Sequence, residues 1–334
     1  MPSERSDDWT CRFFRDGDEQ GILDVLLATF GRWPTAELTV PPIDHLHWKL
    51  RSDDLALRSH AVVELHGRII ACHVTISQHV KVGLRVLTTC HGVDAATLPE
   101  FQARGAGRDL RRFNAEARPK HYDLYFGIQS DHAAMPNLRK QDWTGARLVR
   151  RGEILVADAP LAGGADGSSC TLREVTQFDD RVDGFALEAS APFQRITMRT
   201  KDELNWRYCD RRAGPFRVVL AEERDELIGY VVFRISYERG YIADLLALPG
   251  RLDAAASLIR HAIAGLRAAG ASEIECWSTP GHPYHQVLAD AGFSRIRRKT
   301  TIVHKSVRAP DEWLSCLKDD RATVNVMAGD TDLI

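Results

Sequence analysis

The sequence lacks the features by which several classes of protein are recognised. No apolar stretch approaches the roughly 18 uninterrupted residues of a membrane-spanning helix. The seven cysteines are scattered and odd in number, and none forms a CxxC pair, so we expect reduced thiols, no disulfide framework and no metal site. The formal net charge is only -2, so there is no charge excess of the kind that attracts nucleic acid or an anionic membrane. We therefore expect neither partner.

The first ten residues, MPSERSDDWT, are charged and contain no apolar signal core. Export is therefore not expected, and a cytoplasmic location is predicted. With 334 residues the chain exceeds the usual size of one hydrophobic core, and an apolar fraction of 44% is ordinary for a globular protein. Two domains of about 150 residues each are the natural expectation.

An internal repeat supports two domains. The segment beginning LHWKL at Leu46 resembles the segment beginning LNWRY at Leu204, and VDAATLP (93–99) resembles ADLLALP (243–249). The matched pairs are Trp48 with Trp206, Glu64 with Glu222, Ile70 with Ile228, Leu138 with Leu288, and Trp143 with Phe293. This period is too long for a solenoid, so the chain reads as two copies of one domain. The two tryptophans persist in both copies, which favours a packing role over substrate stacking.

Each copy has the same predicted order of elements. Apolar spacing predicts a helix within 12–30, and two β-branched runs around His66-Gly67 predict a hairpin. The further expected elements of the first copy are strands at 80–90 and 91–98, a helix at 107–117, a strand at 122–128, a short helix at 132–141 and a strand at 146–153. A longer helix is expected at 252–269 in the second copy. This is an α/β (α+β) fold of two tandem domains, each a mixed, mostly antiparallel sheet flanked by helices.

The expected domain boundaries follow from composition. Residues 1–157 form the first domain, and DAPLAGGADGSS (158–169) has the Gly, Ser and Pro content of a linker. Residues 170–308 form the second domain and 309–334 a C-terminal extension. The two copies can make an internal pseudo-dimer, so both a monomer and a homodimer are compatible with the sequence.

The segment QARGAG (102–107) places two glycines just before a predicted helix. A helix N-terminus has four unpaired N–H groups and a partial positive charge, and glycine lets a ligand approach that backbone. Phosphate or pyrophosphate is the ligand best matched to such a site, and four neighbouring arginines add positive charge: Arg104, Arg108, Arg111 and Arg112. The GxxxxGK[ST] pattern of P-loops and the GxGxxG pattern of dinucleotide-binding folds are both absent. A glycine-rich turn that merely starts an arginine-faced helix is the alternative.

The stretch LPEFQARGAGRDL (98–110) resembles the pyrophosphate-binding segment of the GCN5-related N-acetyltransferases, whose pattern is Q/R-x-x-G-x-G/A after a strand ending near a proline. Gln102, Gly105 and Gly107 occupy the fixed positions, and Pro99 lies where that proline is expected. The resemblance extends over both copies and nearly the whole chain. It implies a tandem acetyltransferase fold and binding of acetyl-CoA or another acyl-CoA, with no metal.

The resemblance also implies which residues hold the acyl-CoA. The end of the strand before the loop would pair with the pantetheine arm, and the backbone N–H groups of the loop would bind the pyrophosphate. The implied residues are Ala95, Ala96, Thr97, Gln102, Ala103, Arg104, Gly105, Ala106, Gly107 and Arg108.

The second copy departs from the pattern, because it reads LPGRLDAAASLI where the first reads LPEFQARGAGRD. Leu252 replaces the glutamine, and Ala255 and Ser257 replace the glycines. Their side chains would obstruct phosphate, so only the first copy is expected to bind acyl-CoA.

Three residues are candidates for the chemistry. Members of the resembled family often carry a carboxylate or histidine on the strand before the loop, and a tyrosine as acid toward the leaving thiolate. His91 lies six positions before Thr97, so strand alternation predicts that both face the same side, and a histidine is a suitable base near neutral pH. A half-buried structural histidine is the alternative. Asp94 is the competing base, although a β-bulge would be needed to turn it toward the cleft, and its counterpart Asp244 favours a structural role.

The family's usual tyrosine is missing, because its spacing falls on Leu138, which cannot donate a proton. Tyr125 is the candidate acid, with Asp131 and His132 as alternatives, and Tyr284 of the HPYH segment could be recruited from the second copy.

The function that the resemblance implies is transfer of an acyl group, first of all acetyl, from CoA to an amine of a small molecule, amino sugar or peptide by direct attack. The segment TVPPIDHLH (39–47) is a candidate acceptor loop. A non-catalytic acyl-CoA-binding or scaffold protein of the same fold is the alternative. Transfer of an aminoacyl group from tRNA, known in tandem relatives, is disfavoured by the intact loop and the absence of a basic excess.

Overall fold

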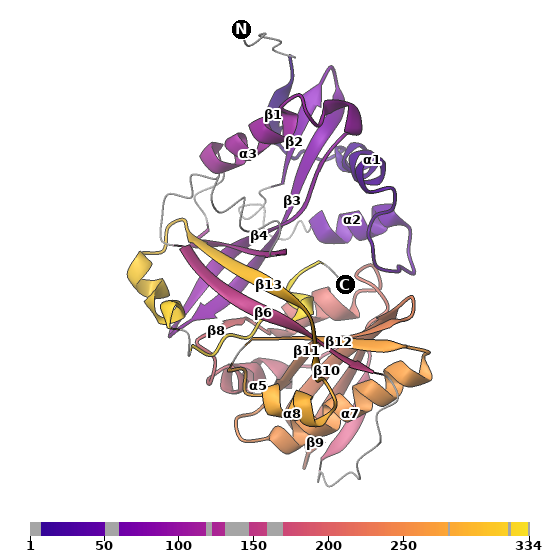
Figure 1. Cartoon of the computed structure of the whole chain (residues 1–334), viewed down its shortest axis with the longest axis vertical. Coiled ribbons are helices and arrows are strands. Elements are labelled where there is room, and N and C mark those ends of the chain that lie inside the picture. Colours follow the sequence, from indigo (N-terminus) through magenta and orange to yellow (C-terminus); the bar gives the residue numbers. More distant parts are fainter. Residues whose placement is uncertain are drawn as a thin grey trace.

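The computed structural model describes residues 8–50, 60–117, 122–130, 147–158, 170–279, 281–319 and 322–332. Its strands form one continuous sheet that runs the length of an elongated molecule, with the N-terminal elements at the top of Figure 1 and α7 and α8 at the bottom. The strand order is β1-β2-β3-β4-β5-β13-β6-β12-β11-β10-β9-β7, and β8 pairs with β3 off this path. We call the part built on β1–β5 the N-terminal half and the part built on β7 and β9–β12 the C-terminal half.

The N-terminal half places α1 and α2 on one side of its strands and α3 on the other (Figure 1). Its elements are β1 (Thr10–Phe13), α1 (Glu19–Phe30), α2 (Pro42–Leu50), β2 (Ala61–Leu65), β3 (Arg68–Val82), β4 (Arg85–Thr97), the 3-10 turn η2 (Pro99–Phe101), α3 (Ala106–Ala117), β5 (Leu124–Ser130) and β6 (Arg147–Asp158). Ile22, Val25 and Leu26 of α1 and Leu110 of α3 are buried against the sheet, as their helical spacing requires.

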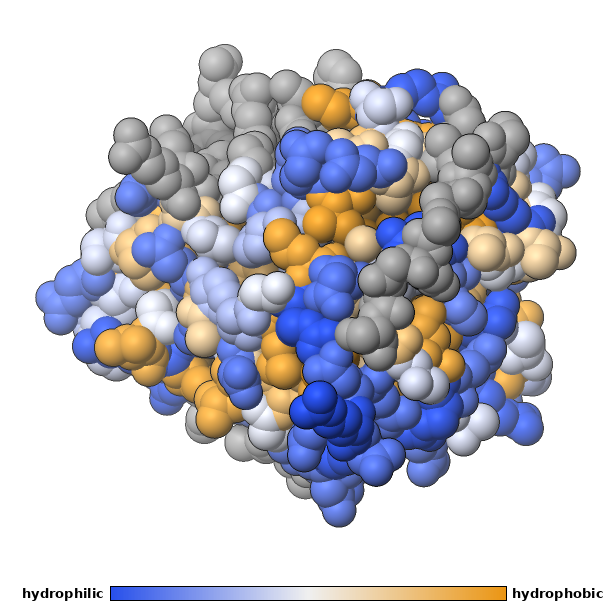
Figure 2. Space-filling model, turned by 90° about the horizontal axis from the view of Figure 1, so that it is seen from below, coloured by the Kyte–Doolittle hydropathy of each residue, from blue (hydrophilic) through white to orange (hydrophobic). Residues whose placement is uncertain are grey.

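The C-terminal half repeats this order. Its elements are β7 (Thr171–Val175), α5 (Arg181–Ala189), β8 (Arg195–Thr197), α6 (Lys201–Leu204), the π-helical turn η3 (Asn205–Cys209), β9 (Arg217–Glu223), β10 (Glu226–Ser236), β11 (Arg239–Ala247), α7 (Leu252–Ala268), β12 (Glu273–Ser278), α8 (His285–Asp290), β13 (Arg295–Ser306), and the 3-10 turns η4 (Asp311–Lys318) and η5 (Ala328–Asp330). The tandem α/β architecture predicted from the repeat is thus the one observed. Seen from below the view of Figure 1, hydrophobic residues form patches among hydrophilic ones (Figure 2).

The two halves exchange their last strands. β6 follows β5 along the chain but pairs with β12 and β13, and β13 follows β12 but pairs with β5 and β6. The two strands therefore cross the middle of the molecule side by side (Figure 1). Because β6 pairs with β12 and β13, and β13 in turn pairs with β5 and β6, each of these strands pairs with strands of the other half, and the expected boundary at residue 157 stays a prediction.

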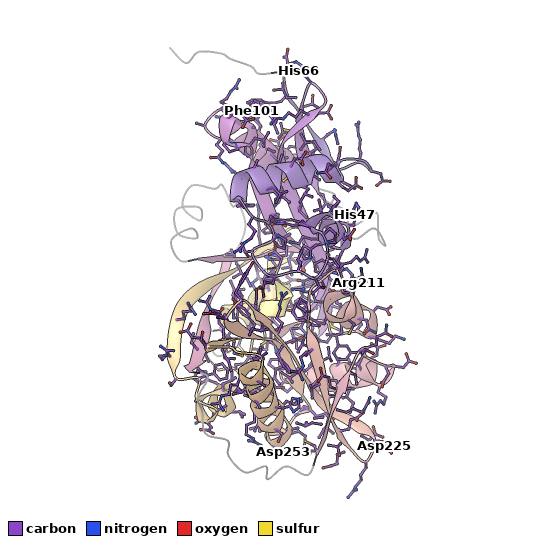
Figure 3. All side chains as sticks on the ribbon, turned by 90° about the vertical axis from the view of Figure 1, so that its right-hand side faces the viewer. His47, His66, Phe101, Arg211, Asp225 and Asp253 are labelled. Atoms are coloured by element: carbon purple, nitrogen blue, oxygen red, sulfur yellow. The ribbon has the colours of Figure 1, made fainter. Side chains whose placement is uncertain are left out.

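The repeated tryptophans meet where the halves join. Trp48 and Trp206 stack with ring centroids 4.9 Å apart, and the indole N–H of each donates to the backbone carbonyl of the other at 2.9 and 3.4 Å. The packing role predicted for them is confirmed. In the same region His45 of α2 lies 2.7 Å from the Arg212 carbonyl, and Figure 3 shows His47 and Arg211 near each other there.

Two predicted strand boundaries were wrong. Residues 80–90 were expected to form one strand, but β3 runs to Val82, the chain turns at Gly83 with φ +58°, and β4 begins at Arg85. The expected strand at 91–98 is the end of β4. The predicted hairpin around His66 is confirmed, although its second strand was expected to end at Ser77 and extends to Val82. The helices that became α3 and α7 are confirmed to within one residue at each end.

Candidate functional site

The glycine loop adopts the backbone conformation that its glycines permit. Gly105 has φ +106°, a conformation that other residues rarely adopt, and a Cβ there would lie 2.9 Å from Arg108 Nη2. A Cβ on Gly107 would lie 2.9 Å from Thr97 Oγ1. A side chain at either position would therefore collide with a neighbour, and the two glycines leave the backbone bare at the start of α3. Ala106 between them is buried and anchors the helix to the core.

The first turn of α3 presents unpaired donors. The helix begins at Ala106, and the Asp109 N–H donates to the Gly105 carbonyl at 2.9 Å, which closes the first turn. The N–H groups of Gly105 to Arg108 lie before that bond, where the N-terminus of a helix leaves donors without an intrahelical acceptor. Arg108 and Arg112 are largely exposed, with 73% and 66% of their side chains accessible. This loop fits a bound pyrophosphate in backbone, space and charge.

β4 and β5 separate just before the loop. They pair in parallel at Thr89↔Leu124, Cys90↔Tyr125 and His91↔Phe126, and beyond this point β4 continues to pair only with β3. Ala95 and Ala96 lie on the part of β4 that β5 has left. The Thr97 carbonyl accepts hydrogen bonds from Thr29 Oγ1 and Gln102 Nε2, both at 3.1 Å. Gln102 thus fixes the loop to the strand end, and the roles predicted for these residues toward acyl-CoA stay predictions.

A β-bulge in β4 changes which residues share a face. His73 of β3 pairs with Ala95 and Thr75 pairs with Gly92, so Val93 and Asp94 together oppose one residue of β3. Past this bulge the side-chain alternation is reversed, so His91 and Thr97 face opposite sides of the sheet. The prediction that they share a face was wrong, because it assumed an unbroken period of two. The bulge that Asp94 needed to turn its side chain is present.

His91 is buried on the side of the sheet away from α3. Its Nδ1 lies 3.1 Å from the Phe126 carbonyl, which can only accept, so Nδ1 carries the proton of the neutral ring and Nε2 is left as an acceptor. Burial lowers the pKa of His91 below its usual value, although Asp332 opposes this effect. The neutral ring can accept a proton at Nε2, but with reduced basicity.

Asp94 belongs to a buried cluster of charges. Its carboxylate accepts from Trp33 Nε1 and Lys49 Nζ, each at 2.8 Å, and Lys49 also bonds Asp332 at 3.1 Å. Burial raises the pKa of Asp94 above its usual value, and Lys49 opposes this effect. In the C-terminal half Asp244 likewise lies beside a bulge, and it pairs with Arg199 at 2.8 Å. The shared arrangement favours the structural role for Asp94.

Tyr125 points to the opposite side, toward α3, and its neighbours there were not predicted. A Cβ on Gly92 would lie 2.5 Å from Tyr125 Oη and 2.6 Å from His73 Nε2, while Asn114 of α3 lies 2.8 Å from His73 Nδ1. Sequence reasoning missed His73 and Asn114. The repeat could have indicated His73, because the second copy, which has no loop glycines, has Val231 at the matching position.

The corresponding place in the C-terminal half is closed. Ala247 ends β11 as Thr97 ends β4, and both its N–H and its carbonyl are bonded to the hydroxyl of Tyr284, at 2.8 and 3.1 Å. Tyr284 therefore fills its own half's site and is not available to the other. Ala255 and Ser257 are buried in the first two turns of α7. Figure 3 shows the two regions far apart, with Phe101 beside the start of α3 and Asp253 at the start of α7 at opposite ends.

Some predicted elements and residues lie outside the described residues: Asp131, His132, Leu138, Trp143, the expected short helix at 132–141 and nearly all of the expected linker. Within the described ranges no group of three or more His, Cys, Asp or Glu side chains is arranged to hold a metal ion. No helix there combines the length and apolar character needed to cross a bilayer.

The sequence and the fold were compared with those of known proteins. No family model matches the sequence, and no curated protein shows significant similarity to it. Among solved structures, a probable N-acyltransferase of unknown function from Enterococcus faecalis matches with a TM-score of 0.65 at 12% identity, covering 90% of this chain and 73% of its own. Saccharomyces cerevisiae N-myristoyltransferase with bound myristoyl-CoA matches at 0.62 and 11% identity, covering 92% and 80%.

A GCN5-related N-acetyltransferase from Kribbella flavida matches with a TM-score of 0.61 at 15% identity, covering 91% of this chain and 72% of its own. Each likeness spans both halves of the chain, and identities this low establish the fold alone. The chain therefore has the fold of the GCN5-related N-acetyltransferases, in the tandem form that it shares with N-myristoyltransferase.

Proposed function

We propose that the protein is an acyl-CoA-dependent N-acyltransferase whose N-terminal half binds the acyl-CoA. The observation that carries the proposal is the contrast between two equivalent places in one chain. At the end of β4 the loop has Gly105 at positive φ, and the backbone N–H groups of Gly105 to Arg108 lie at the N-terminus of α3. At the end of β11 a tyrosine hydroxyl already occupies the backbone.

The N-terminal half would hold the ligand with groups that the fold already positions. The N–H groups of Gly105 to Arg108 would bind the pyrophosphate, whereas the Arg104 N–H donates to the Phe101 carbonyl at 3.2 Å; arginines of α3 would add positive charge. Ala95 and Ala96, on the part of β4 that β5 has left, would meet the pantetheine arm. Bound there, an acyl-CoA supplies a thioester whose carbonyl carbon an amine can attack.

Two residues at the separation of β4 and β5 are the candidates for proton transfer. His91 Nε2 would take a proton from the amine on one side of the sheet. Tyr125, on the other side, would give its proton to the sulfur. Burial lowers the pKa of His91, so this residue is a weak base and serves an amine that is already partly deprotonated in solution. The fraction of neutral amine grows with pH, and the rate should therefore rise toward alkaline pH.

A pocket of about 510 Å³ is the proposed entrance for the amine. It is lined by the chain between α1 and α2 and by the C-terminal half, including Arg32, Trp33, Val40, Pro215 and Tyr237. Trp33 joins its wall to Asp94 on β4 through the 2.8 Å hydrogen bond. Thr39, Val40 and Pro42, of the loop expected to contact the acceptor, are part of the lining. The acceptor class proposed is a small-molecule or peptide amine.

Isothermal titration with acetyl-CoA, longer acyl-CoAs and free CoA tests the binding, and thiol release with a panel of amines tests the transfer. We expect acyl-CoA binding with a stoichiometry of one, lost in Gly105→Trp, and an acyl chain preference that the titration itself defines. Absence of binding would refute the proposal. Binding without thiol release for any amine would favour the non-catalytic acyl-CoA-binding protein. One observation supports that alternative: Asp94, the competing candidate base, is buried and bonded to Lys49.

A further inference from the structure

Two polar side chains converge on Gly92, on the side of the sheet that carries α3. A Cβ on this glycine would lie 2.5 Å from Tyr125 Oη and 2.6 Å from His73 Nε2, closer than real Cβ contacts allow. Gly92 has no unusual φ, so it is required for space and not for backbone conformation. The glycine lets a phenol from β5 and an imidazole from β3 meet over β4.

The meeting point lies where β4 and β5 separate. Tyr125 pairs with Cys90, and the next pair, His91↔Phe126, is the last between the two strands. The start of α3, with the open glycine loop, lies on the same side, because the Gly107 Cβ position is 2.9 Å from Thr97, which shares the His73 face. The cluster thus faces the proposed acyl-CoA site. His91 and the charges of Lys49 lie on the other side.

Asn114 sets the protonation of His73. Its amide nitrogen lies 2.8 Å from His73 Nδ1, and an amide N–H only donates, so Nδ1 accepts and the proton of the neutral ring is on Nε2. That proton is directed at the place where Tyr125 Oη lies. Asn114 is buried, and its Oδ1 has no partner in the part of the chain that the structure describes. A buried oxygen without a partner costs free energy. We therefore attribute the presence of an amide at position 114 to its nitrogen, which contacts His73.

The C-terminal half supplies an internal comparison. The strand pairing aligns His73↔Ala95 with Val231↔Leu245, Thr75↔Gly92 with Phe233↔Ile242, and Cys90↔Tyr125 with Gly240↔Ile274. Val231, Ile242 and Ile274 therefore stand where His73, Gly92 and Tyr125 stand, and all three are fully buried. The copy without the loop glycines has an ordinary apolar core here, and the copy with them has the polar cluster. Packing alone does not require the polar residues.

We propose that His73, oriented by Asn114, positions and activates Tyr125 as the proton donor to the sulfur of the departing CoA. The inference rests on the proposed function. As the carbon–sulfur bond breaks, the sulfur takes the phenolic proton and CoA leaves as the thiol. The His73 Nε2–H donates to the phenolate oxygen, and a hydrogen bond to the charged form favours that form. The proton that the amine loses in forming the carbon–nitrogen bond returns through solvent to the phenolate, so the proton balance closes.

Binding of product CoA tests this without an acceptor. Titrations compare CoA with desulfo-CoA, which lacks the sulfur, at pH 7 and pH 8.5. A thiol has a pKa near 8.5, so a phenol that donates to the thiolate makes the preference for CoA grow with pH, to about tenfold for one charge-assisted bond. We expect wild type to show this preference. Tyr125→Phe should abolish it, and His73→Ala should reduce it several-fold, while both bind desulfo-CoA normally.

Further variants separate positioning from folding. His73→Gln, which can place an amide N–H near the Nε2 position, should recover part of the preference. Gly92→Ala retains both polar side chains but fills their space, so it should lose the preference as well. Its control is Gly184→Ala on α5, where a Cβ has nothing within 4 Å and φ is not positive. His66→Ala, at the distant β2–β3 turn in Figure 3, controls for histidine removal.

The outcomes distinguish two failures. If folded His73→Ala and Gly92→Ala bind CoA with the wild-type preference at both pH values, the positioning role is refuted and the proposed function stands. If wild type binds CoA and desulfo-CoA equally at both pH values, Tyr125 does not contact the sulfur and the inference is wrong. If wild type binds neither, the proposed function fails and the inference fails with it.

Discussion

Replacing Gly105 by tryptophan is the sharpest perturbation of the proposed acyl-CoA site. At φ +106° any side chain is strained, which costs roughly 1–2 kcal/mol of folding stability. The indole would also cover the N–H groups that precede Asp109. Loss of two charge-assisted hydrogen bonds to a phosphate removes about 3–6 kcal/mol, so the dissociation constant of acetyl-CoA should rise by roughly 10²- to 10⁴-fold. Isothermal titration measures the affinity, and urea unfolding measures the stability.

Gly250→Trp is the matched control. Gly250 follows the Leu-Pro of the second copy, has φ +81°, and has nothing within 4 Å of its Cβ position. The substitution should cost a similar 1–2 kcal/mol of stability and leave acetyl-CoA affinity unchanged. If Gly105→Trp folds and binds acetyl-CoA within threefold of wild type, the loop does not bind the pyrophosphate. If the control loses affinity as much as Gly105→Trp does, the effect is one of stability and the reasoning fails.

Three further changes have defined consequences. Asp330→Asn leaves Arg199 with one of its two carboxylates in a fully buried site, and urea unfolding should show a loss of about 3–5 kcal/mol; a loss below about 1 kcal/mol would contradict the role of this pair. Burial lowers the pKa of His282 to about 3. Below pH 6.5 the unfolded chain therefore takes up a proton at this residue that the folded chain does not, so the free energy of unfolding falls toward pH 3 at about 1.4 kcal/mol per pH unit. His282→Asn should flatten the fall in unfolding free energy between pH 6 and pH 4, and an unchanged slope would refute this. Tyr284→Phe removes the partner of both backbone groups of Ala247 and should cost about 1–3 kcal/mol in urea unfolding; an unchanged free energy of unfolding would contradict this role of the hydroxyl.

The repeat made much of the fold predictable, because two versions of one pattern confirm each other. The helix α3 was located because its segment is rich in Arg, Leu, Ala and Glu and is followed by Pro119, and α7 was located as its counterpart in the second copy. The turn at Gly83 was missed because β3 and β4 are long and alternate without a polar break. The exchange of β6 and β13 could not be predicted, since strand partners distant in the chain leave no trace in local periodicity.

The candidate site divides in the same way. The glycine loop is contiguous, so its residue types and spacing were sufficient to place the start of α3, while its role toward acyl-CoA stays a prediction. His91 and Asp94 were recognised as residues, but their direction depends on a bulge, which one extra residue creates and which alternation cannot reveal. His73 and Asn114 come from a strand and a helix 41 residues apart and meet only in the folded chain.

The strand exchange gives the C-terminal half a role even though its own site is closed. β5, which carries Tyr125, is paired with β4 at only three positions, whereas β13 pairs with it along its full length, and Lys305 is the direct partner of Tyr125. The same half also contributes Asp332, which is bonded to Lys49 beneath β4. An unpaired β5 would be an exposed edge strand, free to shift toward the separation from β4. The copy that lost its glycines therefore fixes the position of the strand on which the proposed proton donor of the other copy lies.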